Sequence, residues 1–354
     1  MSSIPGPPHR PRTSGRAVAS IVLGALSCAV PAALAIPGAV FTLVGLAPAI
    51  FWHAAQVVTA VPATIYGFLS LRDTRRGQGL IQGRGFAVSG IVLSVLATIF
   101  VMPAVQFGMV IPTILEAKQQ KQSMLNLKAI VMAMHKYHDE YSRFPPAVVF
   151  SVDGKPLYSW RVRLLPFLGH VKLYERFKLD EPWDSPTNKP LLAQMPVEFA
   201  PPGERFPPAD FTTNYLVFDG PDAVFQTNRR PKWLDDPLNQ GRISGMQLHP
   251  QRPGDQPVYD FGEWARMASI TDGPGNTILL VEADERVPWT KPQDLPYAKD
   301  RPLPKLGGHY HGDFVVALAD GSVRIVAKKV SEQSIRAAIT PRGDEIPAPD
   351  WTAP

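Results

Sequence analysis

The most informative segment of the chain reads Thr113-Ile-Leu-Glu-Ala-Lys-Gln-Gln-Lys-Gln-Ser-Met-Leu-Asn-Leu-Lys-Ala-Ile-Val-Met-Ala-Met-His-Lys-Tyr-His-Asp-Glu-Tyr141. It contains no Pro or Gly and is rich in helix-forming residues. Its apolar and aromatic side chains recur at spacings of three and four, the period of one helix face. They are Met124, Leu127, Ile130, Val131, Met134, Tyr137, His138 and Tyr141. The segment therefore predicts a long amphipathic helix with one stripe to bury, ended by Pro145 and Pro146.

Two long runs before this helix contain no Asp, Glu, Lys or Arg, and they extend over Ala17–Leu71 and Gly85–Leu115. About 18 apolar residues without charge suffice for a candidate membrane span. We predict a transmembrane domain at 17–112 with about three spans, the last of which continues into the helix. The spans lie near 17–36, 40–71 and 86–110. The first run makes one or two passes, depending on breaks at Pro48 and Pro62.

A secretory signal peptide is the alternative for the first run, because Arg16 precedes it and Ala33-Leu34-Ala35 resembles a cleavage site. The apolar stretch continues well beyond the apolar core of a signal peptide, which favours membrane spans.

The basic charge of the chain lies almost entirely at its N-terminal end. Residues 1–85 hold seven arginines and one acidic residue, Asp73, whereas the remaining residues are balanced to within one charge. Arginine-rich segments next to membrane spans stay in the cytoplasm. We therefore predict a cytoplasmic tail at 1–16, a cytoplasmic arginine-rich loop at 72–85, and an extracytoplasmic domain at 113–340. This placement means a multi-pass protein of the inner membrane with the lipid bilayer as partner and no nucleic-acid partner.

The chain after the helix has the pattern of short strands among Pro-rich loops, which predicts an α+β domain with an antiparallel sheet. The strands are predicted at Trp160–Leu168, Phe211–Phe218, Asn276–Val281, Phe314–Ala319 and Ser322–Ala327. Asp320-Gly321 between the last two is a hairpin signal, because both residue types tolerate positive φ. Residues 341–354 are predicted to be a flexible Pro-rich tail. We find no internal repeat.

Two parts of the chain resemble known families. Ser14–Gly24, Tyr66–Arg72 and Gly83–Leu93 resemble a small bacterial membrane domain of unknown function, a Gly-rich hairpin with an arginine-rich cytoplasmic loop, over about residues 14–110. Residues 115–330 resemble a family of unknown function that is abundant in planctomycetes and has prepilin-type architecture. The matching segments are 126–146, 159–168, 179–189, 270–278, 287–296 and 319–324.

The second resemblance implies a pilin-like fold, in which a long N-terminal helix lies across an antiparallel sheet. The prepilin leader is absent, and the polytopic N-terminal domain supplies the membrane helix instead. The family also has a His before its Asp-Gly motif, where this chain has Tyr310 between His309 and His311. The resemblance supplies no reaction.

Two clusters are candidate metal sites. Asp180-Glu181-Pro-Trp-Asp184 offers oxygens that suit calcium, and some pseudopilins carry a similar loop; the alternative is a turn in which these residues cap the backbone. His309-Tyr-His311-Gly-Asp313 has the pattern of a binuclear metallohydrolase. Its alternative is a loop that enters the hairpin, with histidines bonded to the backbone.

Other chemistry is weakly indicated. Glu282, Asp284 and Glu285 offer acid–base groups, although such a cluster at a strand end is usually solvated. The single cysteine, Cys28, excludes a disulfide scaffold and a cysteine-based metal site. We therefore expect a non-enzymatic, membrane-anchored pilin-like protein with a structural or adhesive role towards envelope proteins or polymers, without a required cofactor. The alternative is a metal-dependent envelope hydrolase that uses His309, His311 and Asp313.

Overall fold

The structure is a computed structural model of the whole chain. It describes residues 12–34, 47–76, 81–82, 84–96, 99–100, 102–203, 206–227, 247–248, 256–261, 265–307, 312–343 and 351. The chain divides into two compact units, Met1–Leu115 and Glu116–Pro354. We call them the helical unit and the α+β unit, and describe each by itself.

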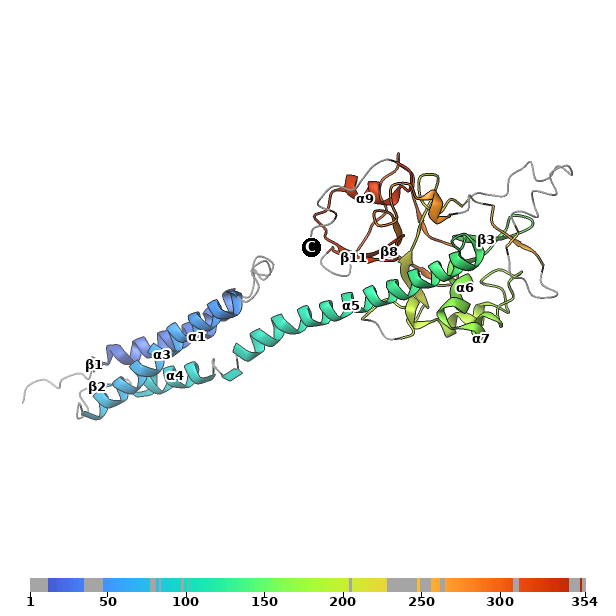
Figure 1. Cartoon of the computed structure of the whole chain (residues 1–354). Helices are drawn as coiled ribbons and strands as arrows, with labels where there is room; N and C mark the ends of the chain where they lie inside the picture. The colour runs from blue at the N-terminus through green and yellow to red at the C-terminus, as the bar shows by residue number, and fades with distance from the viewer. Residues whose placement is uncertain are drawn as a thin grey trace, which may run out of the picture. The chain divides into compact units, whose positions relative to one another are not determined.

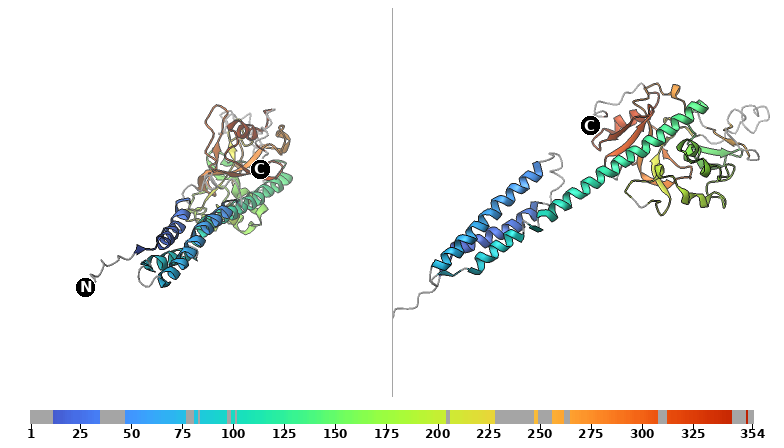
Figure 2. Two further views of the ribbon diagram at one scale, coloured as in Figure 1. Left: turned by 90° about the vertical axis from the view of Figure 1, so that its left-hand side faces the viewer. Right: turned by 60° about the horizontal axis from the view of Figure 1, so that its bottom comes forward.

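Among the described residues of the helical unit, three helices lie side by side in every view (Figure 1, Figure 2). They are α1 (Gly15–Leu34), α3 (Ala47–Arg76) and α4 (Arg84–Leu96). Two short strands, β1 (Arg12–Thr13) and β2 (Ile81–Gln82), pair in parallel directly before α1 and before α4. Because of this pairing, α1 and α4 begin at the same end of the unit. Pro62 lies inside α3, which continues through it.

Small side chains fill the space between these helices. The buried positions are Ala17, Ser20 and Gly24 in α1, Ala60, Ala63, Gly67 and Ser70 in α3, and Ala87, Gly90 and Ser94 in α4. A Cβ atom on Gly90 would lie 2.5 Å from the carbonyl carbon of Ser20, so the two backbones are in close contact there. Only glycine permits that approach.

The helical unit contains a repeat, so our expectation of none was wrong. Residues 15–26 and 85–96 are identical at seven of twelve positions, including Ala17/Ala87 and the Ile-Val-Leu triplets that begin at Ile21 and Ile91. Their buried positions also correspond, Ser20 to Gly90 and Gly24 to Ser94.

Among the described residues, no helix is both long and apolar enough to be identified as a membrane span. The spans predicted near 17–36, 40–71 and 86–110 therefore stay a prediction.

Helix α5 (Met102–Tyr141) contains the predicted amphipathic helix and begins within the third predicted span. Helix α4 ends at Leu96 and α5 starts at Met102, and residues 97, 98 and 101 between them lie outside the described residues, so the continuation of the span into the helix stays a prediction. Pro103 lies in the first turn of α5, where a proline is tolerated. At the other end Ser142 has a positive φ of 55°, and Phe144-Pro145-Pro146 leads away from the helix.

A four-stranded antiparallel sheet is the centre of the α+β unit, with strand order β11-β10-β8-β5. The strands are β5 (Thr212–Leu216), β8 (Ile278–Pro288), β10 (Phe314–Leu318) and β11 (Val323–Val326). One face packs on α5, with Leu127, Val131 and Met134 of the helix in the same cluster as Val315 and Ala317. The predicted helix stripe and antiparallel pairing are thus confirmed.

The opposite face of this sheet is also buried. Phe314, Val316 and Leu318 alternate with the α5-facing residues of β10 and join a second cluster that contains α9 (Glu332–Ile339). Trp351 is buried there, with 4% of its surface exposed. The Pro341 carbonyl accepts a hydrogen bond from the Thr271 backbone N–H, which holds the start of the segment 341–354 against the α+β unit. The flexibility predicted for the rest of this segment stays a prediction.

Smaller elements complete the unit (Figure 1). A three-stranded antiparallel sheet has the order β4-β3-β7, formed by β3 (Val148–Ser151), β4 (Pro156–Ser159) and β7 (Val258–Tyr259). Strands β6 (Phe218–Asp219) and β9 (Leu295–Pro296) pair in parallel.

The strand predicted at Trp160–Leu168 was wrong. These residues form α6 (Trp160–Leu164) and a 3₁₀ turn, Leu165–Leu168. Ser159 caps α6, because its Oγ accepts a hydrogen bond from the Arg161 backbone N–H at 3.2 Å. The α6 sequence Trp-Arg-Val-Arg-Leu alternates apolar and charged residues, which is the pattern of a half-buried strand. In the structure all five residues are buried, including both arginines.

Candidate functional site

The most concentrated polar chemistry of the α+β unit is a buried ion pair. Arg161 in α6 and Asp294, between β8 and β9, are joined by a 2.9 Å contact between Nη2 and Oδ1. Their side chains are 0% and 1% exposed. The Asp294 carboxylate also accepts hydrogen bonds from the Trp160 indole N–H at 3.2 Å and from the Val217 backbone N–H at 3.0 Å. Arg161 donates to the Tyr215 carbonyl at 2.8 Å.

These bonds place three distant segments of the chain in one fixed arrangement. Burial raises the pKa of Asp294 to about 6, and Arg161 and the hydrogen bonds act in the opposite direction. Burial likewise lowers the pKa of Arg161 against the effect of Asp294. Because the pair is closed to solvent, a substrate cannot reach it. Its role is to join α6, β5 and the segment before β9.

Arg163, two residues further on, is enclosed by tyrosines. Its Nη1 donates to the Tyr174 hydroxyl at 3.1 Å, and its guanidinium lies 5.9 Å from the ring centre of Tyr137. Burial lowers the pKa of Arg163, but Tyr137, Tyr174 and Tyr158 raise it by more, so the group stays charged. Charge and hydropathy patterns did not reveal either arginine as an internal residue, since arginine is normally a surface residue.

The predicted calcium candidates lie in a turn organised by Asn188. The Asn188 amide nitrogen donates to the carbonyls of Lys178, Glu181 and Pro182, and its oxygen accepts from the Lys178 N–H. Glu181 accepts from Ser185 at 2.8 Å, Asp180 accepts from the Gln256 N–H at 3.3 Å, and Asp184 is exposed. The turn interpretation explains these contacts, whereas calcium binding at Asp180, Glu181 and Asp184 stays a prediction.

Of the second metal candidate, only Asp313 lies within the described residues. His309 and His311 lie outside the described residues. The Asp313 carboxylate accepts a hydrogen bond from the Lys328 backbone N–H at 3.0 Å and so helps to hold the β10–β11 hairpin. In the described part of the chain, no three His, Cys, Asp or Glu side chains are grouped so that they could hold a metal ion.

The acidic cluster of β8 is divided between the interior and the surface. Asp284 and Glu285 are exposed as expected, but Glu282 is fully buried, so a solvated Glu282 was a wrong expectation. Its Oε1 accepts from the Asn214 amide at 3.3 Å, and it is the register partner of Tyr215. The neighbouring Tyr215 hydroxyl accepts from Asn126 of α5 at 3.3 Å, which links the helix to this polar part of the sheet.

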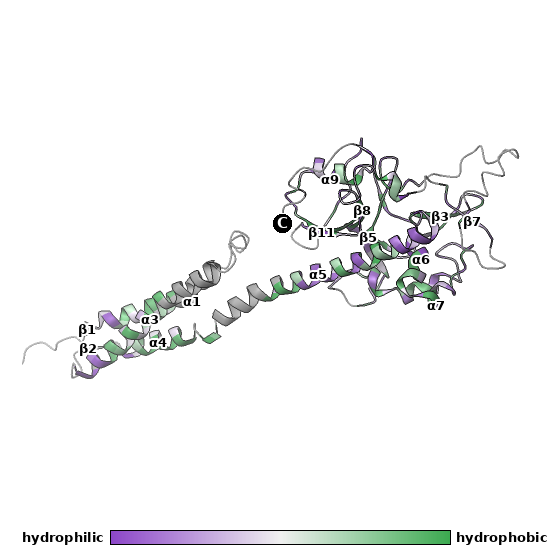
Figure 3. Ribbon diagram, in the orientation of Figure 1, coloured by the Kyte–Doolittle hydropathy of each residue, from purple (hydrophilic) through white to green (hydrophobic). Residues whose placement is uncertain are grey.

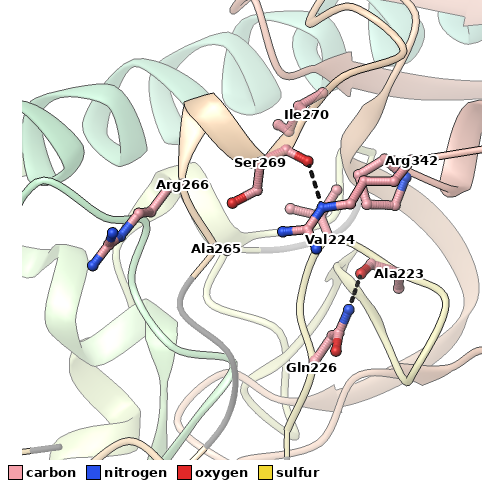
Figure 4. Close-up of a pocket in the computed structure, with 9 residues that line it drawn as sticks. Ala223, Val224, Gln226, Ala265, Arg266, Ser269, Ile270 and Arg342 are labelled. Carbon is pink, nitrogen blue, oxygen red and sulfur yellow. Dashed lines mark hydrogen bonds between the residues drawn. The ribbon is translucent and has the colours of Figure 1, made fainter.

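Hollows of different sizes lie in the surface of the described part of the α+β unit. The one in Figure 4 is lined by Arg266, Ser269, Ile270 and Arg342 among others, and Arg342 donates to the Ser269 carbonyl at 2.9 Å. Its volume is about 10 Å³, which is about the space of one water molecule. Two larger hollows of about 400 and 420 Å³ flank residues 297–305 and are open to solvent.

The outer surface of the helical unit is the most unusual surface in the described structure. Large apolar side chains point outward on all three helices, including Val22 of α1, Phe68 of α3 and Val92 of α4. Phe68 is 62% exposed. Apolar residues cover much of α3 and α4 in Figure 3. A water-soluble bundle has the opposite arrangement, with its large apolar residues inside.

The α+β unit matches a known protein family. Residues 116–309, more than half of the chain, match the family described as Protein of unknown function (DUF1559). The chain belongs to this family. The DUF1559 match begins in α5 and includes the Arg161–Asp294 pair and the Asn188 turn, so the predicted membership of a family of unknown function is confirmed. No curated protein and no solved structure matches the chain.

Proposed function

We propose that this DUF1559 protein is a membrane-anchored, non-enzymatic protein that displays a pilin-like α+β domain outside the cytoplasm, where it has a structural or adhesive role. The helical unit would be the anchor. The observation that carries the proposal is the reversed packing of that unit, with small residues between its helices and large apolar residues on its outer surface.

This packing fits lipid as the surrounding solvent. In a bilayer, helices associate through small residues and interhelical hydrogen bonds, because lipid tails already solvate large apolar side chains. The Ser20 hydroxyl donates to the Ala63 carbonyl at 2.8 Å, and Thr64 and Ser94 bond to each other at 3.0 Å. The long runs without charge support the same environment.

The orientation follows from the arginines. Arg16, Arg75 and Arg84 lie at the end where α1 and α4 begin and α3 ends, and the positive-inside rule assigns that end to the cytoplasm. The α+β unit would then be extracytoplasmic. Helix α5 on an antiparallel sheet supports a pilin-like architecture, and the closed Arg161–Asp294 pair is consistent with a non-catalytic interior.

Cysteine labelling tests this proposal. In a Cys28→Ala background we place one cysteine at Thr187, which is exposed, or at Gln78 in the arginine-rich loop. In spheroplasts, an impermeant maleimide should label Thr187→Cys directly and Gln78→Cys only after lysis. The opposite pattern would overturn the orientation, and recovery of the chain in the supernatant after alkaline carbonate extraction would overturn the anchor. Zinc or manganese in the purified protein would support the hydrolase alternative instead.

A further inference from the structure

The arginines of the helical unit gather at one end, which we call the basic end. It consists of Arg16, Arg72, Arg75, Arg76 and Arg84, all with exposed side chains. The parallel pairing of β1 with β2 places the start of α1 beside the start of α4, and α3 ends just before β2 (Figure 1). All three helices therefore contribute arginines to the same end.

The positive charge of the basic end is largely uncompensated within its own unit. Asp73 is the only acidic residue in residues 1–115. Its carboxylate is paired with Arg16, with 2.8 Å between Arg16 Nη1 and Asp73 Oδ2. No other acidic residue of the unit remains to neutralise Arg72, Arg75, Arg76 and Arg84.

A ring of exposed apolar side chains lies next to these arginines on each helix. In α1, Val18 follows Arg16 by two residues, and in α4, Phe86 follows Arg84 by two. In α3, Phe68 precedes Arg72 by four residues. Each of these three apolar side chains is more than 40% exposed. At 1.5 Å of rise per residue, charge and apolar ring are separated by about 3–6 Å along the helices. Arginine can lay its aliphatic stem along such an apolar surface while its charged guanidinium stays in the polar layer.

We propose that the basic end binds the phosphate groups of anionic phospholipids in the cytoplasmic leaflet, which deepens the proposed function and rests on it. The adjoining apolar ring favours a lipid surface over a nucleic acid, because a nucleic-acid duplex offers the arginines phosphates but offers the ring no acyl chains to contact. The partner is therefore identified by its phosphate and its acyl chains together.

The test measures the affinity of the full-length chain, in nonionic micelles, for fluorescent phosphatidylglycerol and for fluorescent phosphatidylcholine. We expect phosphatidylglycerol to bind at least about tenfold more tightly, since each arginine near an anionic lipid surface contributes appreciably. The double variant Arg75→Gln/Arg76→Gln should lose most of this preference, and Arg75→Lys/Arg76→Lys should keep it. Lys136→Gln/Lys172→Gln, which removes two exposed charges from the α+β unit, is the matched control and should have no effect.

A gain-of-function variant protects the test against misfolding. Asp73→Asn removes the only acid at the basic end and should tighten phosphatidylglycerol binding several-fold, which a damaged fold would not do. Equal affinity for the two lipids, or no change in Asp73→Asn, would overturn the inference. So would displacement of the lipid by inorganic phosphate, or by a short DNA duplex, at concentrations where the lipid itself binds. If the lipid-binding test fails while cysteine labelling gives the expected orientation, only the recognition of anionic lipid is refuted. If alkaline carbonate releases the chain from the membrane, both the lipid recognition and the proposed membrane anchor are refuted.

Discussion

Arg161 and Arg163 lie two positions apart in a five-residue helix. Both are buried, but different groups surround their charges. Arg161 has a carboxylate partner, whereas Arg163 is enclosed by tyrosine hydroxyls and rings. A buried charge requires a partner, because the interior cannot solvate it as water does. The two arginines therefore fix how α6 meets β5 and α5.

The first prediction concerns the ion pair. Asp294→Asn leaves the Arg161 charge buried without its counter-charge, so the free energy of unfolding should fall by about 3–5 kcal/mol. Chemical denaturation of the full-length protein in detergent measures the loss. Asp284→Asn on the exposed part of β8 is the control and should change stability by less than about 0.5 kcal/mol. Equal effects of the two substitutions would contradict a central role for the pair.

A second prediction follows from the titration of Asp294. Its pKa is raised from 3.8 to about 6, so between these values the folded protein retains the proton that the unfolded chain releases. The contribution of this group to stability is therefore complete below about pH 4, decreases as the pH rises to 6, and is constant above. The pH dependence of unfolding should show this decrease in the wild type and lack it in Asp294→Asn. Parallel curves would contradict it.

Asn188 offers a third prediction at the scale of one residue. Asn188→Ala removes an amide that serves three backbone carbonyls and one N–H, so we expect a loss of at least about 2 kcal/mol. The exposed neighbour Thr187→Ala should be nearly neutral. A thermal melt of each variant, with calcium and with a chelator, measures both effects. A melting temperature that rises with calcium would show that the folded protein binds the ion.

The fourth prediction belongs to the packing of α1 against α4. Gly90→Val should separate these helices, because even a Cβ at this position would overlap the Ser20 backbone. Gly85→Val, in the same helix with nothing near its Cβ, is the matched control. Crosslinking of the detergent-solubilised unit, or its melting temperature, should fall for Gly90→Val only. A stable Gly90→Val protein would mean that α1 and α4 do not approach as closely as described.

Local sequence signals predicted some elements well. Helix α5 and the β10–β11 hairpin depend on patterns within a few residues, namely the stripe from Met124 to Tyr141 and the turn at Asp320-Gly321. In that turn only Gly321 has a positive φ. The strand predicted at Trp160–Leu168 was wrong because apolar residues alternate with Arg161 and Arg163, which is the pattern of a half-buried strand, whereas both arginines are buried in a helix. The internal position of Asp294 depends on Arg161, 133 residues away, which local patterns do not contain.

The two units of the chain follow opposite packing rules. In the α+β unit large residues such as Trp160 and Trp289 are buried, while in the helical unit large residues such as Phe68 and Phe86 are outside and small ones are inside. Composition averaged over the whole chain hides this difference, because the apolar fraction is ordinary. The proposed membrane anchor accounts for this contrast, since lipid would surround the helical unit and water would surround the α+β unit.

A fifth prediction follows for the whole molecule. A chain that starts at Glu116 keeps every residue of α5 that packs in the first core cluster, from Leu127 to Tyr137, together with the complete four-stranded sheet. It should therefore fold in aqueous buffer without detergent and unfold cooperatively, whereas the complementary chain 1–115 should require detergent or lipid to stay dispersed. Circular dichroism and size-exclusion chromatography decide both. A disordered 116–354 fragment, or a helical fragment 1–115 that is monomeric in plain buffer, would contradict the division into two solvents.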